Sequence, residues 1–171
     1  FNFYKYINYL HGNFDYLEIG TYEGNSAMFV ARTFPNSRVF CVDNWNKTEE
    51  YGDQDFSLVE QNFDNNCLSL KNIVKIKKDS DNFFLENKVH FDVIYIDGHH
   101  KDFQVLKDCR NAWKYLKPGG ILICDDYIWN FYKNLKENPC YSINLFLKEI
   151  KNKKRILEVS KSQIFIKKIY E

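Results

Sequence analysis

Short apolar runs alternate with helix-patterned segments along most of the chain, and this alternation constrains the fold more than any other feature. Each run is strand-sized and rich in β-branched or aromatic residues. The run at residues 91–97 is nearly continuous, as is typical of parallel strands that are buried on both faces. Five strands are therefore predicted, over residues 15–20, 38–43, 73–77, 91–97 and 121–125.

The segments between these runs carry apolar residues at helical spacing. In one of them Phe56, Val59 and Phe63 recur at intervals of three and four, and would share one face of a helix. The Lys-Pro-Gly-Gly sequence at residues 117–120 is expected to stop another helix. Helices are predicted over residues 25–34, 55–67, 101–116 and 141–151.

The end of the chain has two strand-like runs with no helix between them. Residues 156–160 and 163–169 are predicted strands, joined by a tight turn at Lys161-Ser162. They must pair antiparallel, because a parallel link needs a longer crossover. Elsewhere the alternation implies βαβ crossovers. We therefore predict one α/β domain over residues 1–171, with a doubly wound, mostly parallel sheet and an antiparallel terminal strand.

Composition and charge argue against several classes of protein. The 24 Lys and Arg residues nearly balance the 23 Asp and Glu residues, which disfavours a broad nucleic-acid-binding surface. The apolar runs are far shorter than the ~20 residues that a membrane span needs, and no signal peptide is visible. The five cysteines show no C-x-x-C spacing, as expected of thiols in a reducing compartment. We expect a cytoplasmic protein that binds neither nucleic acid nor membranes.

Doubly wound sheets bind ligands at the carboxyl ends of their strands, so the residues there are the candidates for a site. Gly20 and Gly24 follow the first strand: Gly20 lets the chain turn sharply, and Gly24 lets a ligand approach the start of the next helix. The alternative is an ordinary strand-to-helix turn. Asp43 ends the second strand and can accept both hydroxyls of a ribose, unless it only caps a helix or a turn.

Three carboxylates end the fourth and fifth strands. Asp97 closes the fourth, and Asp125 and Asp126 close the fifth. Neighbouring strands end ~5 Å apart, so these charges would repel one another unless a cation lay among them. Oxygen ligands with room for water suit Mg²⁺. The alternative is that the three residues form turns and helix caps.

Three side chains that carry nitrogen follow Asp97 directly. His99, His100 and Lys101 would lie beside the expected cation, and a histidine there can titrate near neutrality. Consecutive residues at a strand end point in different directions. We therefore expect one of the three to face the site, as a candidate general base.

Taken together, these segments resemble the class I S-adenosylmethionine-dependent methyltransferases, above all the metal-dependent O-methyltransferases of the catechol and macrolide-sugar type. Residues 18–26 are similar to the first motif of that family, E-x-G-x-x-x-G-x-S. Residues 96–100 and 117–127 resemble its I-D-G-x-H and K-P-G-G…D-D-Y signatures. The resemblance covers residues 15–169, and it implies a seven-stranded sheet with the strand order 3-2-1-4-5-7-6.

The resemblance also implies S-adenosylmethionine and a divalent cation, Mg²⁺ or another, as cofactors. In the family, Gly20 and Gly24 would line the methionine part of the cofactor and Ser26 would bind its carboxylate. Asp43 would hold the ribose, and Asp79 and Ser80 would contact the adenine. The implied cofactor-binding set is Glu18, Gly20, Tyr22, Gly24, Ser26, Asp43, Asp79, Ser80 and Asp97. The implied metal ligands are Asp97, Asp125 and Asp126, and the implied base is His100, followed by His99.

The chain departs from the family pattern in two places. His99 stands where many relatives have an acidic residue, which leaves the identity of the base open. Few residues precede the first strand, where the family usually has more helix over the substrate. Two explanations are open: either the chain is a fragment, or its substrate site is unusually open or is completed by a partner subunit, as in a homodimer.

The expected reaction is methyl transfer from S-adenosylmethionine to a hydroxyl of a small molecule, either a sugar or an aromatic compound. A nicotinamide-dependent oxidoreductase is an alternative, but the G-x-G-x-x-G fingerprint is absent. A domain that binds cofactor or a partner without turnover is another. Methylation of nitrogen in RNA or protein is disfavoured by the balanced charge and the absence of an N/D-P-P-Y motif. Five aromatic residues either stack on the acceptor or belong to the core: Trp45, Tyr127, Trp129, Phe131 and Tyr132.

Overall fold

Seven strands form one sheet in the computed structural model, which describes residues 3–7, 10, 13–160 and 162–169. The strand order is β3-β2-β1-β4-β5-β7-β6. All neighbours pair in parallel except β7, which runs antiparallel to both β5 and β6. The predicted order and the antiparallel terminal strand are confirmed. The strands are β1 (Asp15–Ile19), β2 (Arg38–Asp43), β3 (Ile73–Lys77), β4 (Phe91–Ile96), β5 (Leu116–Cys124), β6 (Lys154–Val159) and β7 (Ile164–Lys168).

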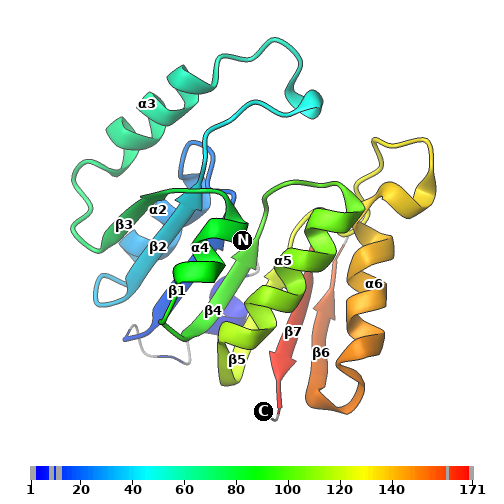
Figure 1. Ribbon diagram of the computed structural model, residues 1–171. Coiled ribbons are helices and arrows are strands. Elements are labelled where there is room, and N and C mark those ends of the chain that lie inside the picture. The colour runs from blue at the N-terminus through cyan, green and yellow to red at the C-terminus, as the bar shows by residue number, and fades with distance from the viewer. Residues whose placement is uncertain (1–2, 8–9, 11–12, 161, 170–171) are drawn as a thin grey trace.

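Helices cover both faces of the sheet, as the doubly wound fold requires. Figure 1 shows α4, α5 and α6 on one face, and the apolar side chains of these three helices share one core cluster. The helices α1, α2 and α3 contribute to a second cluster on the other face. The helices are α1 (Phe3–Ile7), α2 (Asn25–Thr33), α3 (Phe56–Cys67), α4 (Ser80–Glu86), α5 (Asp102–Tyr115) and α6 (Pro139–Glu149), with short 3₁₀ turns at Glu49–Tyr51, Leu135–Glu137 and Lys151–Lys153.

Strand β4 shows why the fourth apolar run has no polar face. Ile94 and Ile96 belong to the cluster under α4, α5 and α6, whereas Val93 and Tyr95 belong to the cluster under α1, α2 and α3. Both sets are almost completely buried. Alternate residues of a strand point to opposite faces, so a strand covered on both sides must be apolar throughout.

The sequence suggested that the Lys-Pro-Gly-Gly segment separates a helix from a strand. In the structure this segment lies inside β5. Helix α5 already ends at Tyr115, and β5 begins at the next residue. Leu116 pairs with Phe91 and Ile121 pairs with Val93, so residues 117–120 form a bulge inside β5. A Cβ atom at Gly120 would lie 2.8 Å from the carbonyl oxygen of Asp92, and glycine therefore permits this bulge.

Helix α4 was missed by the sequence analysis, although a local signal for it exists. Asp79 caps this helix by accepting a 2.8 Å hydrogen bond from the backbone N–H of Asn82. The helix buries Phe83 and Phe84. Except for β5, which begins five residues before its predicted start, the predicted elements lie within two residues of their observed bounds. Of the predicted terminal turn, Lys161 falls outside the described residues.

Across the part of the chain that the structure describes, no helix combines the length and the apolar character needed to cross a membrane.

Candidate active site

A cavity of about 230 Å³ lies at the carboxyl edge of the sheet, where the sequence placed the site. It is bounded by the ends of β1, β2 and β4, by the starts of α4 and α5, and by the loop after β2. Among the predicted site residues, Gly20, Tyr22, Asp43, Asp79, Ser80, Asp97 and His99 line it. Among the described residues, Glu18, Gly24, Ser26, His100, Asp125 and Asp126 lie outside its lining.

Gly20 joins the ends of β1 and β4 by close backbone packing. Its φ of +81° is in the left-handed region, and its N–H donates a 2.9 Å hydrogen bond to the carbonyl of Val42. A Cβ atom at this position would collide with the carbonyl oxygen of Asp97. Glycine therefore brings the first loop directly against the residue that ends β4.

Packing against α3 explains why position 24 is a glycine. A Cβ atom there would lie 2.9 Å from the ring of Phe63 and 3.0 Å from the sulfur of Cys67, both on α3. The space left by the missing side chain is therefore filled by α3. The role of Gly24 at a cofactor stays a prediction.

Glu18 is fully buried beneath the first loop. Its carboxylate accepts hydrogen bonds of 2.8 Å each from the hydroxyls of Tyr16, Thr21 and Ser26. Burial raises the pKa of Glu18 to about 7, against the lowering effect of these hydrogen bonds. Glu18 thus ties the loop and the start of α2 together from inside.

Asp43 joins the loop after β1 to the loop after β2. Its Oδ2 accepts hydrogen bonds from the backbone N–H groups of Thr21 (3.0 Å) and Tyr22 (2.9 Å), and its Oδ1 accepts one from Trp45 (2.8 Å). Each carboxylate oxygen can accept two hydrogen bonds, so Oδ1 can accept one more, and Asp43 lines the cavity.

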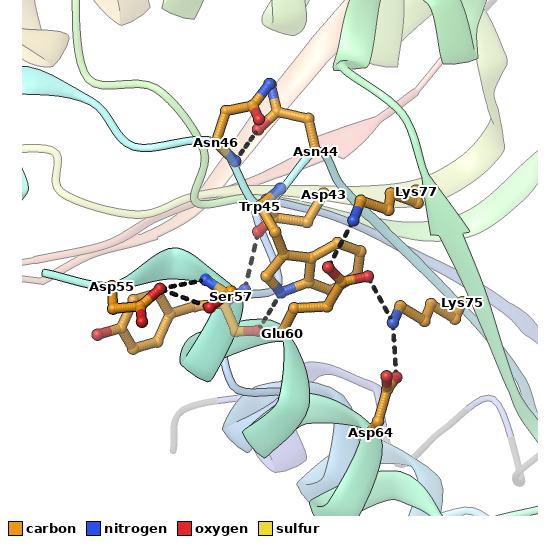
Figure 2. A network of polar contacts seen from close by, with 11 residues as sticks. Asp43, Asn44, Trp45, Asn46, Asp55, Ser57, Glu60, Asp64, Lys75 and Lys77 are labelled. Atoms are coloured by element: carbon orange, nitrogen blue, oxygen red, sulfur yellow. Dashed lines mark hydrogen bonds and ion pairs between the residues drawn. The ribbon is translucent and has the colours of Figure 1, made fainter.

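Ion pairs fasten α3, which follows the loop after β2, to strand β3. Figure 2 shows Glu60 of α3 between Lys75 and Lys77 of β3, at 2.9 and 2.5 Å, with Asp64 pairing Lys75 at 2.6 Å. Trp45 is 4% exposed and packs beneath this network against Phe63. The structure therefore favours Trp45 as a core residue over Trp45 as a residue that stacks on the acceptor.

Asp97, His100 and Asp126 converge beside the cavity. One side-chain donor atom from each lies within 4.8 Å of the other two. The Nε2 of His100 is 2.8 Å from Asp126, and its Nδ1 is 2.8 Å from Glu50. Burial, followed by the charges of Asp125 and Asp126, raises the pKa of Asp97 well above its usual range. Burial opposes the charge of His100, but the two carboxylate partners prevail and raise its pKa to about 10.

This cluster differs from the predicted set of three carboxylates. Asp125 is not part of it: one oxygen of Asp125 accepts hydrogen bonds from the Tyr95 hydroxyl and, at 2.9 Å, from the side-chain amide of Gln163. His100 takes its place. The oxygens of Asp125 are engaged locally: Oδ1 accepts a 2.8 Å hydrogen bond from the backbone N–H of Asp126, and Oδ2 accepts from Tyr95 and Gln163.

The donor set fits a divalent cation. Two carboxylates and an imidazole are common ligands of such ions. The Nε2 atom of His100 is buried and has no hydrogen-bond partner among the described residues, although an oxygen of Asp126 is at ion-pair distance. A bound cation or a further acceptor oxygen would satisfy this atom.

His99 and Lys101 take other positions. His99 lines the cavity and accepts a 3.0 Å hydrogen bond at Nδ1 from the backbone N–H of Lys101. The ammonium of Lys101 lies over the ring of Tyr132 and 3.8 Å from Glu49. Of the three candidate bases, His100 is therefore the one that the structure places in the cluster with Asp97 and Asp126.

A family model described as a methyltransferase domain matches residues 17–127, which are about two thirds of the chain. The chain belongs to this methyltransferase family.

Solved structures with the methyltransferase fold resemble the whole described domain. The O-methyltransferase TomG from Streptomyces achromogenes, involved in tomaymycin synthesis and solved with SAM, has a TM-score of 0.72 at 11% identity, over 96% of this chain and 78% of that one. The O-methyltransferase from Bacillus cereus, solved with SAH, has a TM-score of 0.65 at 17% identity, over 93% and 76%. An rRNA methylase from Streptococcus thermophilus has a TM-score of 0.65 at 12% identity, over 91% and 87%. A search of curated proteins finds no match.

The methyltransferase domain has further site residues that the sequence analysis missed. Glu50, Thr48 and Tyr51 reach the cavity from the loop after β2, and nothing in the sequence of that loop marks them. Gln104 and Asp108 line it from α5. Their spacing of four on a predicted helix was a usable signal, since it places two polar side chains on one helical face.

Aromatic residues of the loop after β5 lie beside His100 in this methyltransferase. Trp129 packs on the imidazole with a ring-centroid distance of 4.7 Å, and Phe131 stacks on Trp129. Tyr132 donates a 2.7 Å hydrogen bond to Glu50. Tyr127, by contrast, packs against the core. Of the five aromatic candidates, Trp129, Phe131 and Tyr132 thus lie near His100 and Glu50.

Proposed function

We propose that this domain transfers the methyl group of S-adenosylmethionine to a hydroxyl oxygen of a small molecule, a sugar or an aromatic compound. The observation that carries the proposal is the double position of Asp97. Asp97 lines the cavity together with Asp43, and it also belongs to the cluster with His100 and Asp126. A cofactor in the cavity and an acceptor at the cluster would therefore meet at this residue. The family assignment, and similar folds solved with SAM and SAH, support this cofactor.

The chain supplies alignment and a proton acceptor, because the sulfonium methyl is already a strong electrophile. Asp97 and Asp126 would hold a divalent cation, which lowers the pKa of a hydroxyl bound to it. His100 would take the proton of that hydroxyl at Nε2. Glu50 contacts Nδ1 at 2.8 Å and would orient the ring with Nε2 toward Asp126. A cation bound beside the ring would lower the raised pKa of His100, so that Nε2 could accept the proton. Trp129 covers the imidazole and would limit access of water.

The charges at the mouth favour a small acceptor over RNA, although an rRNA methylase is among the similar structures. Glu49, Glu50 and Asp126 all lie on this side of the cavity, and they would repel a phosphate backbone. Formal charge over the whole chain is only +1. A neutral sugar or a phenol meets no such repulsion.

Calorimetric titration with S-adenosylhomocysteine and with NADH, followed by methyl-transfer assays on phenols and sugars, tests the proposal. We expect binding of S-adenosylhomocysteine, no binding of NADH, and turnover that EDTA abolishes. The His100→Gln variant should bind S-adenosylhomocysteine with unchanged affinity and lose most of its turnover. Binding of NADH alone would overturn the proposal, and full activity in EDTA would refute the role of a cation.

A further inference from the structure

Tyr95 carries a hydroxyl within the apolar run of β4, and the function proposed above gives this residue no role. Its side chain is 3% exposed, on the face of the sheet that α1, α2 and α3 cover. A buried tyrosine hydroxyl normally has a hydrogen-bond partner. The hydroxyl of Tyr95 contacts two carboxylates, Oδ2 of Asp97 at 3.1 Å and Oδ2 of Asp125. It therefore lies between the acids that follow β4 and β5.

The pairing of β5 with β7 brings a fourth side chain to the same place. Cys124 of β5 pairs with Ile164 of β7 in antiparallel register, so Asp125 and Gln163 are opposite each other one residue further along. The side-chain amide of Gln163 donates a 2.9 Å hydrogen bond to Oδ2 of Asp125. The turn between β6 and β7 thus contacts the edge of the sheet where the cluster of Asp97, His100 and Asp126 lies.

Hydrogen-bond donors are unevenly distributed over the two carboxylates. The phenol of Tyr95 has one hydrogen for two carboxylate oxygens. Asp125 has further donors, because Gln163 serves its Oδ2 and the backbone N–H of Asp126 donates a 2.8 Å hydrogen bond to its Oδ1. Within the described part of the chain, the Tyr95 hydroxyl is the side-chain donor that reaches Asp97. By serving Asp125, Gln163 leaves the hydrogen of Tyr95 available to Asp97.

We propose that Tyr95 is a positioning residue that orients the Asp97 carboxylate for cation binding in the cluster, and that Gln163 supports it through Asp125. The inference rests on the proposed function, since it takes a divalent cation as the ligand of the cluster. A carboxylate fixed at Oδ2 rotates less and can offer its other oxygen to the cation. Asp125, which the family resemblance placed among the metal ligands, instead serves as the acceptor that anchors Tyr95.

Calorimetric titration of the protein with Mn²⁺, and separately with S-adenosylhomocysteine, tests the inference. Tyr95→Phe removes the hydroxyl and keeps the ring, so the affinity for Mn²⁺ should fall about tenfold, as is typical for partners of ligating side chains. Methyl transfer by this variant should need correspondingly more Mn²⁺, with kcat at saturating Mn²⁺ close to that of the wild type. A general loss of packing would instead lower kcat at every Mn²⁺ concentration. Tyr115→Phe is the matched control, because the Tyr115 hydroxyl donates a 3.0 Å hydrogen bond to the carbonyl of Phe84, outside the cavity lining.

Gln163→Leu gives an independent measurement, because Gln163 lies in the turn before β7 rather than in the core. Without the amide of Gln163, the hydroxyl of Tyr95 is drawn toward Asp125, and the affinity for Mn²⁺ should fall about threefold. The double variant should bind Mn²⁺ no more weakly than Tyr95→Phe alone, since Gln163 acts through Tyr95. Additive losses from the two substitutions would show that Gln163 acts by another route, and would overturn its part in the proposal.

The outcomes separate this inference from the proposed function. Unchanged affinity for Mn²⁺ in Tyr95→Phe, with a normal melting transition, would overturn the inference and leave the proposed function intact. Equal losses in Tyr95→Phe and Tyr115→Phe would do the same. A wild-type protein that binds S-adenosylhomocysteine but no Mn²⁺ would overturn the inference and the role of a cation, and binding of neither would overturn the proposed function as well. If Tyr95→Phe fails to fold, the result for Gln163→Leu decides.

Discussion

Glu50 and His100, fifty residues apart in the chain, are joined by a 2.8 Å contact between Oε2 and Nδ1. Glu50 comes from the 3₁₀ turn after β2, and His100 from the loop after β4. The contact closes the loop after β2 over the cluster of Asp97, His100 and Asp126. It also leaves the Nε2 atom of the imidazole directed at Asp126.

Replacing Glu50 by glutamine should therefore impair turnover more than cofactor binding, although Glu50 also lines the cavity. Loss of the carboxylate leaves the imidazole free to rotate and to change tautomer, and outer partners of this kind typically contribute tenfold to a hundredfold. We expect kcat to fall at least tenfold while the Kd for S-adenosylhomocysteine changes much less. Glu49→Gln is the control, because Glu49 is exposed and contacts only Lys101 among the ion pairs described. Equal effects of the two substitutions would show that the contact has no such role.

The two adjacent carboxylates after β5 should behave differently toward a metal ion. Asp126→Asn should lower the affinity for Mn²⁺, measured by calorimetric titration, at least tenfold, because Asp126 belongs to the cluster. Asp125→Asn should change it much less, since Asp125 is occupied by Tyr95 and Gln163. A larger loss from Asp125→Asn would instead support the ligand set predicted from the sequence.

Asp108 should make stability depend on pH. Its pKa is about 7 in the folded protein and 3.8 in a model peptide, so the folded state binds its proton more tightly. Well below pH 3.8 both states are protonated and the acid has no net effect on folding. As the pH rises from 4 to 7 the unfolded state loses the proton first, and the free energy of unfolding falls by about 4 kcal/mol at most.

Urea denaturation of wild type and Asp108→Asn at pH 5 and pH 8 measures this contribution. The difference in stability between the two proteins should shift in favour of the variant as the pH rises. A difference that is constant with pH would show that Asp108 ionises normally in the folded state.

Gly20 should be among the positions least tolerant of a side chain. An alanine there combines a left-handed φ with a collision against the Asp97 carbonyl, and the cost should be about 3 kcal/mol or more. Gly52 offers the matched comparison. Its φ is +54°, but an added Cβ would have no neighbour within 4 Å in the described part of the chain. With its ψ of −124°, Gly52 has a backbone conformation that other residues rarely adopt, so Gly52→Ala should cost about 1–3 kcal/mol in urea denaturation, without the added cost of a collision. Similar losses at both positions would show that the collision is relieved by a small shift.

The sequence by itself determined the succession of strands and helices. Runs such as residues 91–97 are apolar on both faces, and the periodicity of α3 sets one buried stripe, so both signals are local. The same local signals placed the candidate residues at the carboxyl edge of the sheet. The strand order came from the resemblance to a known family, and the observed pairing agrees with it.

The tertiary structure alone decided which side chains meet. Asp97 meets His100 and Asp126 in the cluster, whereas Asp125 is bonded to Tyr95 and Gln163, and residue types alone do not specify these contacts. The partners Glu50 and Asp108 reach the site through a loop and a helix whose positions are set by contacts between distant segments. Spacing along the chain fixes the element that a residue belongs to, but the direction of a side chain at a strand end depends on how the loops pack against one another.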